Sequence, residues 1–547
     1  MLNKLKQTSV FFLILMATIL IGTVFLFFCK IGISPFHLPV FFAISSLFYC
    51  ILYRQATNKD KILVILLSFT ILFFTTLVAT VTFDRSSDGN TYHKDAIGVL
   101  KEGFNPVYES SADFIKKRTD ESKKLKNYSI WTDHYAKANW IIAANFYSLT
   151  NNIESGKAMN FITLYLVFGF LAFSLSQYLT KYKAVILAFL VVFNPITASQ
   201  LFTYYNDQLV CLYLFLAIAF LIQLDHNIHD KKNWLYYGLT FILLANMKFN
   251  GLGYLLVFSF FFVCRYLYKS YRQQIFLKTF QKLCCYFIPL FVISLLIVGY
   301  PTYVKNTIDH HNPFFPLYDD KGEDIITQQQ PQKFLKMNHL EKLFYATFSR
   351  ANNLRKNDKT ELKIPFTISK DEIIPAMSND LRISGFGLLY SGLLICSLLI
   401  LIIYYPLYKQ NSWILYTLFI TCGLLIFMSE SWWARYTPHF YLFLLLSLYI
   451  LFRYGKHPFT KKIYVAIILV NALIPFCGNT YYTITNSIQI RKTLCQLSGK
   501  KIKVQINGMN GIVYNLKDYH IKYSFTKSNQ KNELYYHYLT YQEYKDE

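Results

Sequence analysis

Long runs of apolar residues recur along the 547-residue chain and set its class of fold. A helix needs about 20 consecutive apolar residues to cross the hydrocarbon core of a bilayer, and the runs are close to that length. Hydrophobic residues make up 54% of the chain and charged residues 16%, whereas soluble domains carry about 25% charged residues. The chain is therefore predicted to be an all-α polytopic membrane protein.

The apolar pattern predicts about 13 membrane-spanning helices of about 17–22 residues, two of them short. The predicted spans are Val10–Phe28, Leu38–Leu52, Ile62–Val81, Phe161–Leu179, Ala184–Phe202, Leu209–Leu224, Trp234–Met247, Leu252–Tyr268, Leu283–Tyr300, Gly387–Tyr405, Trp413–Met428, Phe440–Phe452 and Ile463–Phe476. An odd number of spans puts the C-terminus on the opposite side of the membrane from the N-terminus.

Lysine and arginine side chains concentrate on alternate connections between these spans. Cytoplasmic loops carry an excess of these residues, so the N-terminus is predicted to be cytoplasmic, together with the connections that hold Arg54, Lys59, Lys61, Lys181, Lys183, Lys231, Lys232, Arg265, Lys269, Arg272, Arg453, Lys461 and Lys462. The same bias accounts for the net charge of +24 without a nucleic-acid partner. The predicted location is the inner membrane of a bacterial cell.

Three long segments are predicted on the outer side: 84–157, 301–384 and the tail from about residue 480. Residues 1–480 would form the membrane domain, and 481–547 a small extracytoplasmic C-terminal α/β segment. Within the first outer segment, Tyr135–Thr150 is apolar but short, which predicts a helix lying in the membrane interface. In the tail, "KIKVQI" and "GIVYNL" are predicted to be short strands.

Charged residues cluster at the outer ends of the predicted spans, which are themselves almost free of charge. They are Asp84, Asp88, Asp207 in "TYYNDQ", Lys248 in "NMKFNG", and Glu430 and Arg435 in "SESWWARYTP". A charge at mid-bilayer costs about 2.5–3.5 kcal/mol on insertion scales. Lys248 is therefore predicted to lie at the turn of a hairpin of two short helices.

Each of these residues also has a plain structural explanation. Asp84 and Asp88 are followed by a helical pattern, so either could cap a helix in a solvated turn. Lys248 and Arg435 could anchor helix ends by snorkelling, or they could bind an anionic phosphate. His93 could be a metal ligand, although no clear ligand spacing surrounds it.

Chemistry and topology together suggest a reaction. The chain contains neither a GxxxxGK[ST] nor a GxGxxG nucleotide motif, and the outer face of the membrane supplies no nucleotide sugar. A polyprenyl-phosphate-linked sugar is an activated substrate that reaches this face. Lys248 and Arg435 could stabilise its leaving phosphate, and an outer carboxylate could take the proton of an acceptor hydroxyl.

Several stretches together resemble the GT-C superfamily of membrane glycosyltransferases, which includes protein O-mannosyltransferases and aminoarabinose transferases. They are "SSDGNTYHKDAIGVLKEGFNP", "NMKFNGLG", "KNTIDHHNPFFPLYD" and "WWARYTPHF", and the likeness covers roughly Ile62 to Phe452. Two spans before the first acid depart from the better-known members, and the metal-ligand pattern of the oligosaccharyltransferases is missing.

The resemblance implies a role for each matching position. Asp88 or Asp84 would be the catalytic acid of the first loop, Asp207 a second acid, and Lys248 a contact to the lipid phosphate. The further substrate-binding candidates are Arg435, His93, Tyr92, Glu430 and Asn312. No cofactor is predicted with certainty, and the question of a bound divalent metal ion stays open.

The prediction is thus a glycosyltransferase that uses a polyprenyl-phosphate-linked sugar donor and an envelope glycan or lipid acceptor among membrane lipids. An O-antigen or capsule polymerase or ligase is the nearest alternative, and its leaving group is usually a diphosphate. A lipid-linked sugar transporter or flippase is the alternative from another class. Transporters place charge at the bilayer midplane between related halves, which this sequence does not show.

Overall fold

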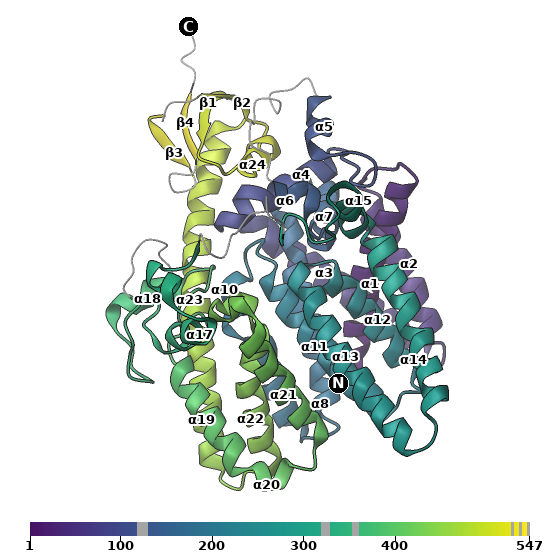
Figure 1. Cartoon of the computed structure of the whole chain (residues 1–547). Helices are drawn as coiled ribbons and strands as arrows, with labels where there is room; N and C mark the ends of the chain where they lie inside the picture. Colours follow the sequence, from purple (N-terminus) through teal and green to yellow (C-terminus); the bar gives the residue numbers. More distant parts are fainter. Residues whose placement is uncertain (118–129, 319–328, 353–359, 527–529, 535–538, 544–547) are drawn as a thin grey trace.

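The computed structural model describes residues 1–117, 130–318, 329–352, 360–526, 530–534 and 539–543. These residues are mostly helical, with a small sheet near the C-terminus (Figure 1). Parts of the predicted outer segments 84–157 and 301–384, and of the tail, lie outside the described residues.

Seven helical segments among the described residues are long and apolar enough to cross a membrane, as expected for a membrane-embedded protein. They are α1 (Leu2–Phe28), α3 (Asn58–Val81), η3 (Ile153–Lys157) with α8 (Ala158–Leu175), α11 (Asp207–His226), α13 (Phe249–Arg272), α14 (Phe276–Phe291) with η4 (Val292–Val298), and α23 (Pro458–Leu497). Four shorter apolar segments are α2 (His37–Leu52), α19 (Tyr390–Ile403), α21 (Ser412–Phe427), and η9 (Pro438–Tyr441) with α22 (Leu442–Tyr454).

Two predicted spans took a different form. The span predicted at Ala184–Phe202 is broken into α9 (Lys181–Val192) and α10 (Pro195–Gln200). Asn194 accounts for the break, because its side chain accepts hydrogen bonds from the backbone N–H groups of residues 196 and 197 and so starts a new helix ahead of Pro195. The last predicted span is only part of α23, and the predicted boundary at residue 480 falls inside this 40-residue helix.

The hairpin predicted around Lys248 is present. Three residues separate the end of α12 (Lys231–Ala245) from the start of α13, and Lys248, the last of them, has an extended conformation. Asn246 helps to close the turn, since its Nδ2 donates to the carbonyl oxygens of Ile242 (2.9 Å) and Ser294 (3.0 Å).

The first predicted outer segment folds into short helices that cover one end of the bundle. They are η1 (Gly89–His93), α4 (Lys94–Lys101), α5 (Ser111–Lys116), α6 (Ile130–His134) and α7 (Ala138–Thr150). The helix predicted at Tyr135–Thr150 is α7, but it does not present an apolar face to the membrane surface. Its residues from Ala138 to Ser148 are all buried, and it packs against α1, α4 and η3.

The second predicted outer segment and the later connections add further short elements. They are η5 (Tyr300–Val304), α15 (Lys305–His310), η6 (Gln332–Lys336), α17 (His339–Phe348), α18 (Lys370–Ala376), α20 (Tyr405–Tyr408), η7 (Ser429–Trp432) and η8 (Ala434–Tyr436). α17 packs against η7, which brings this segment beside the turn that carries Arg435.

The C-terminal residues form a four-stranded sheet with one helix. β1 (Lys501–Ile506) pairs in parallel with β2 (Lys522–Phe525) and antiparallel with β4 (Leu539–Glu543), which pairs with β3 (Asn532–Leu534), so the order is β2-β1-β4-β3. The strand predicted at "KIKVQI" is β1. The strand predicted at "GIVYNL" is instead helix α24 (Ile512–Asp518), because Ile512 and Leu516 fall four residues apart and both enter the core of this unit.

Connections predicted on the same side of the membrane contact one another. At one end, Lys183 Nζ donates to the carbonyl oxygen of Phe452 (2.8 Å) and Arg453 Nη1 to that of Tyr178 (3.0 Å). α20 lies at this end, and the sheet and α5 lie at the other (Figure 1). We call the end that carries Asp207 the site end and the end that carries Arg453 the opposite end.

Candidate functional site

Arg435 lies at the centre of an ion cluster at the site end. It belongs to η8, in the turn between α21 and α22. Its Nη1 lies 3.2 Å from Asp88 Oδ2 and 3.5 Å from Asp207 Oδ2, and its Nε lies 3.3 Å from Asp380 Oδ1. The guanidinium is also flanked by the rings of Tyr205, Trp433 and Tyr436 at 4.6–5.1 Å. Four segments far apart in the sequence therefore meet at one guanidinium.

Lys248 forms the second part of this cluster through an ion pair with Asp207 Oδ1. Asp207 is the first residue of α11, where the positive end of the helix dipole favours a carboxylate. Gln200 Nε2 donates to the other oxygen of Asp207 at 3.2 Å. Asp207 is thus held by a lysine, an arginine, an amide and a helix end.

The three carboxylates differ in the exposed fraction of their side chains. The side chain of Asp207 is fully enclosed, whereas those of Asp88 and Asp380 are 25% and 21% exposed. Asp380 is also tied to Arg382, whose Nε lies 2.6 Å from Asp380 Oδ2. Asp88 contacts one cation in the cluster and receives a 3.5 Å hydrogen bond from Tyr92. Asp88 is therefore the least constrained carboxylate that can meet a substrate.

His93 is buried beside the cluster as a neutral hydrogen-bond donor. Trp140 Nε1 donates to His93 Nδ1 at 2.7 Å, so Nδ1 is the acceptor and the proton resides on Nε2. Burial, aided by the charge of Lys248, lowers the pKa of His93 to about 3. Nε2 has no hydrogen-bond partner among the described residues. In this tautomer His93 presents an Nε2–H donor that no described residue uses.

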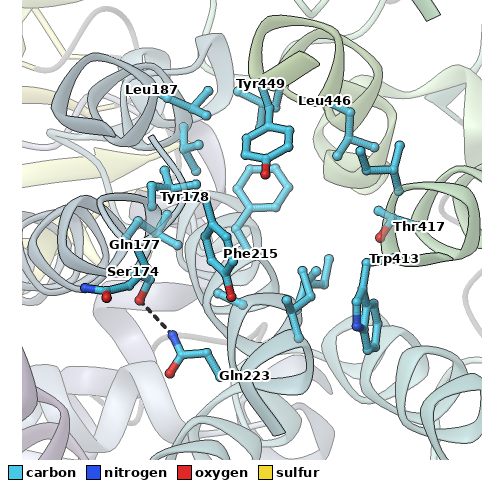
Figure 2. Close-up of a pocket in the computed structure, with 18 of the residues that line it drawn as sticks. Ser174, Gln177, Tyr178, Leu187, Phe215, Gln223, Trp413, Thr417, Leu446 and Tyr449 are labelled. Carbon is cyan, nitrogen blue, oxygen red and sulfur yellow. Dashed lines mark hydrogen bonds between the residues drawn. The ribbon is translucent and has the colours of Figure 1, made fainter. Parts of the chain in front are cut away.

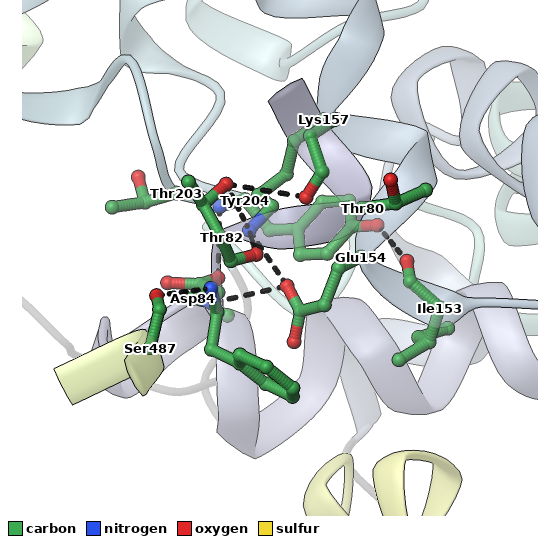
Figure 3. A network of polar contacts seen from close by, with 12 residues as sticks. Thr80, Thr82, Asp84, Ile153, Glu154, Lys157, Thr203, Tyr204 and Ser487 are labelled. Atoms are coloured by element: carbon green, nitrogen blue, oxygen red, sulfur yellow. Dashed lines mark hydrogen bonds and ion pairs between the residues drawn. The ribbon is translucent and has the colours of Figure 1, made fainter. Parts of the chain in front are cut away.

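Asp84, the other acid of the first loop, lies in a separate buried network (Figure 3). Its Oδ1 accepts from the backbone N–H of Ser86 (2.7 Å) and its Oδ2 from that of Tyr204 (2.9 Å). A side chain at Gly89 would collide with Asp84, since its Cβ would lie 1.9 Å from Oδ2. Burial raises the pKa of Asp84. Asp84 thus stabilises the turn that carries Asp88, and its side chain is not exposed to solvent.

Glu154 is the anion at the centre of this second network. It lies 2.5 Å from Lys94 Nζ and 2.7 Å from Lys157 Nζ, and it accepts from the backbone N–H of Asp84 at 3.0 Å. All three charged side chains are fully enclosed. Lys157 Nζ also donates to the carbonyl oxygen of Thr82 at 2.5 Å, which joins the end of α3 to the start of α8 (Figure 3).

The C-terminal unit reaches into this same network through α24. Asn515 bonds both Lys94 Nζ and Glu154 Oε1 at 3.0 Å. Asp518 accepts from the hydroxyl of Tyr147 (2.6 Å) and from the backbone N–H of residue 153 (2.7 Å). The backbone N–H of Gly511 donates to the carbonyl oxygen of Asn90 at 2.8 Å. The unit therefore supports the loop that carries Asp88.

Among the described residues, no hydrogen bond or ion pair joins Glu430 or Asn312 to the cluster. Glu430 bonds the neighbouring hydroxyl of Ser429 at 2.7 Å. Asn312 closes its own loop, since its Oδ1 accepts from the N–H of Phe314 (2.9 Å) and its Nδ2 donates to the carbonyl oxygen of Leu317 (2.7 Å).

Sequence reasoning missed Asp380, Arg382, Gln200 and Glu154. Asp380 and Arg382 stand in "NDLR" within a long segment without periodicity, so no pattern separates them from solvated loop charges. Gln200 resembles an ordinary polar residue at a helix end. Glu154 carried a signal in "IESGK", because an acid and a lysine three residues apart border a predicted span.

No group of three or more His, Cys, Asp or Glu side chains that could hold a metal ion occurs among the described residues. No family model matches the chain, and no curated protein matches it.

Proposed function

We propose that this chain is a membrane glycosyltransferase that moves a sugar from a polyprenyl-phosphate donor to a hydroxyl of an envelope glycan or lipid, as GT-C enzymes do. One observation carries the proposal: Asp88, Asp207, Lys248 and Arg435 come from four separate segments and meet in one cluster at the site end. That arrangement offers cations for a phosphate and an accessible carboxylate for a proton.

Asp88 is the proposed general base. The acceptor hydroxyl oxygen bonds to the anomeric carbon of the sugar. The bond from that carbon to the donor phosphate oxygen breaks, and its electron pair stays with the phosphate. The hydroxyl proton passes to Asp88. Because a carboxylate is a weak base for an alcohol, this transfer is late and accompanies attack.

Lys248 and Arg435 are the proposed phosphate contacts. In the structure both are paired with carboxylates, and the cluster of three acids and three bases is close to neutral. A donor phosphate at Arg435 would take the place of Asp88 at Nη1 and release that carboxylate toward the acceptor. The phosphate gains negative charge as the sugar leaves, so fixed cations stabilise the transition state more than the bound donor.

Asp207 has a supporting role in this scheme. It is fully enclosed and bonded on both oxygens, so it holds Lys248 and Arg435 in place rather than exchanging a proton. His93 presents its Nε2–H beside these residues, which suits an oxygen of the sugar or phosphate.

The experiment is a donor-class assay with the purified full chain in nanodiscs. Polyprenyl monophosphates that carry a labelled hexose or pentose are compared with the corresponding diphosphates, with an envelope extract as acceptor. Released polyprenyl monophosphate with label in the acceptor supports the proposal. Turnover of diphosphates alone would instead point to a polymerase or ligase. In a parallel assay with the chain reconstituted in sealed vesicles, label that crosses the membrane unreacted would point to a flippase.

A further inference from the structure

A cavity lies between the helices at the opposite end, away from the ion cluster. Its volume is about 420 Å³, and it is bounded by α8, α9, α11, α21 and α22. Figure 2 shows Phe215, Tyr178 and Tyr449 around its centre and Trp413 and Thr417 at one side. Most of its walls are apolar, including Leu187 and Leu446.

The cavity has the depth of one membrane leaflet. Along α11 its lining runs from Phe215 to His226, eleven residue steps of about 1.5 Å each, or about 17 Å. Half of a bilayer hydrocarbon core is about 15 Å. The deep end is lined by Leu171, Val191 and Leu442, and each belongs to a predicted membrane helix.

Polar groups gather at the mouth, where the helices end. Gln223 Nε2 donates to Ser174 Oγ at 2.7 Å, close to Gln177 (Figure 2). Asn233 and Asn411 also line the cavity. The apolar interior offers few partners to a water molecule. A molecule with an apolar chain and a polar head matches this division.

The charge around the mouth is positive. Exposed Arg453 bonds the carbonyl oxygen of the lining residue Tyr178 (3.0 Å), and Lys6 Nζ lies 4.3 Å from the ring of the lining residue Phe173. The nearby acids each interact with another cation: Asp225 pairs with Arg265 at 2.9 Å, and Asp230 interacts with Lys6. Arg453 has no ion pair among the described residues. An anionic head group therefore fits better than a zwitterionic one.

We propose that this cavity binds one acyl chain of an anionic phospholipid from the leaflet at the opposite end, with the lipid phosphate near Arg453. This site is independent of the proposed transferase reaction. Its depth of one leaflet suits an acyl chain, whereas a polyprenyl carrier bound at Lys248 would have its phosphate at the site end.

The test uses delipidated full-length protein in detergent, titrated with dioleoyl phosphatidylglycerol, dioleoyl phosphatidylcholine or a polyprenyl phosphate and read by native mass spectrometry. Ala219→Phe places a ring into the cavity wall. Ala466→Phe is the matched control, since Ala466 is exposed on α23 and does not line the cavity. We expect one tightly held phosphatidylglycerol in the wild type and Ala466→Phe, and at least tenfold weaker retention in Ala219→Phe.

Arg453→Gln tests the contact to the lipid head group separately from the contact to the acyl chain. One lost surface cation should weaken phosphatidylglycerol binding about fivefold and leave phosphatidylcholine binding unchanged. If Ala219→Phe fails to fold, quenching of Trp413 by phosphatidylglycerol with brominated chains, measured as the difference from Trp413→Phe, gives a second readout. Equal retention by Ala219→Phe and wild type, no preference for the anionic lipid, or retention of polyprenyl phosphate alone would each overturn the proposal.

Discussion

Arg435 Nη1 lies 3.2 Å from Asp88 Oδ2, although 347 positions separate the two residues in the chain. The contact joins the first loop at the site end to the turn between α21 and α22. It holds an accessible carboxylate next to a buried guanidinium, and the proposed transfer reaction depends on this arrangement.

Asp84→Asn should destabilise the protein. Both oxygens of Asp84 accept backbone N–H groups, and an asparagine would turn an NH2 toward one of these donors. The expected cost is about 1–3 kcal/mol of unfolding free energy, seen as a lower melting temperature in detergent. An Asp84→Asn protein with wild-type melting and no transfer would contradict this structural role and make Asp84 the reacting acid.

Lys248→Met should destabilise the protein and also slow the proposed transfer reaction. The structure pairs Lys248 with fully enclosed Asp207. Removing one partner of a buried pair costs about 3–5 kcal/mol, less here because Arg435 remains. The double variant Lys248→Met/Asp207→Asn should recover most of the loss, and additive losses in this double-mutant cycle would exclude the coupling.

The docking of the C-terminal unit should weaken as pH rises from about 4 to about 7. Burial raises the pKa of Asp518 to about 7 in the folded protein. An unfolded aspartate has a pKa of about 3.9. Between these values the folded state binds more protons, so stability falls with increasing pH. Burial also raises the pKa of Asp95 to about 7, which acts in the same direction.

Asp518→Asn isolates the Asp518 contribution. Its amide can accept from the N–H of residue 153 and donate to the hydroxyl of Tyr147, so the contacts are kept without a titrating group. The protection of the α24 backbone amides from hydrogen exchange should change less with pH in the variant than in the wild type. An identical pH profile in both proteins would assign the effect to other groups.

Topology can be tested with an impermeant thiol reagent on sealed cells. Gly89 is a poor position for a cysteine because Asp84 fills the space beside it. Asp113, on α5, and Gln55, between α2 and α3, are exposed and lie at opposite ends of the protein, so each can be replaced by cysteine. In a background without the native cysteines, Asp113→Cys should react and Gln55→Cys should not. The reverse labelling would put the cluster in the cytoplasm.

Features that depend on local residue pattern and charge could be predicted from the sequence. Apolar run length predicted the long apolar helices, seven of which among the described residues are long and apolar enough to cross a membrane. The cost of a charge in lipid predicted the Lys248 turn. The same logic placed Asp88, Asp207 and Arg435 at one end. Asp380 and Gln200 could not be found, because their importance comes from long-range packing around Arg435. "GIVYNL" was mistaken for a strand because its apolar residues fit both periods over so short a stretch.

Asp88 is proposed to take the proton of the acceptor hydroxyl. This role is tested most directly by single-turnover transfer from a polyprenyl-monophosphate sugar, with wild type, Asp88→Asn and Asp113→Asn in matched nanodiscs. Asp113 is a control acid from the same loop, with a side chain that is 59% exposed and outside the cluster. We expect transfer by wild type and Asp113→Asn, and about 100-fold slower release of polyprenyl phosphate by folded Asp88→Asn. Transfer by Asp88→Asn at the wild-type rate would contradict this role.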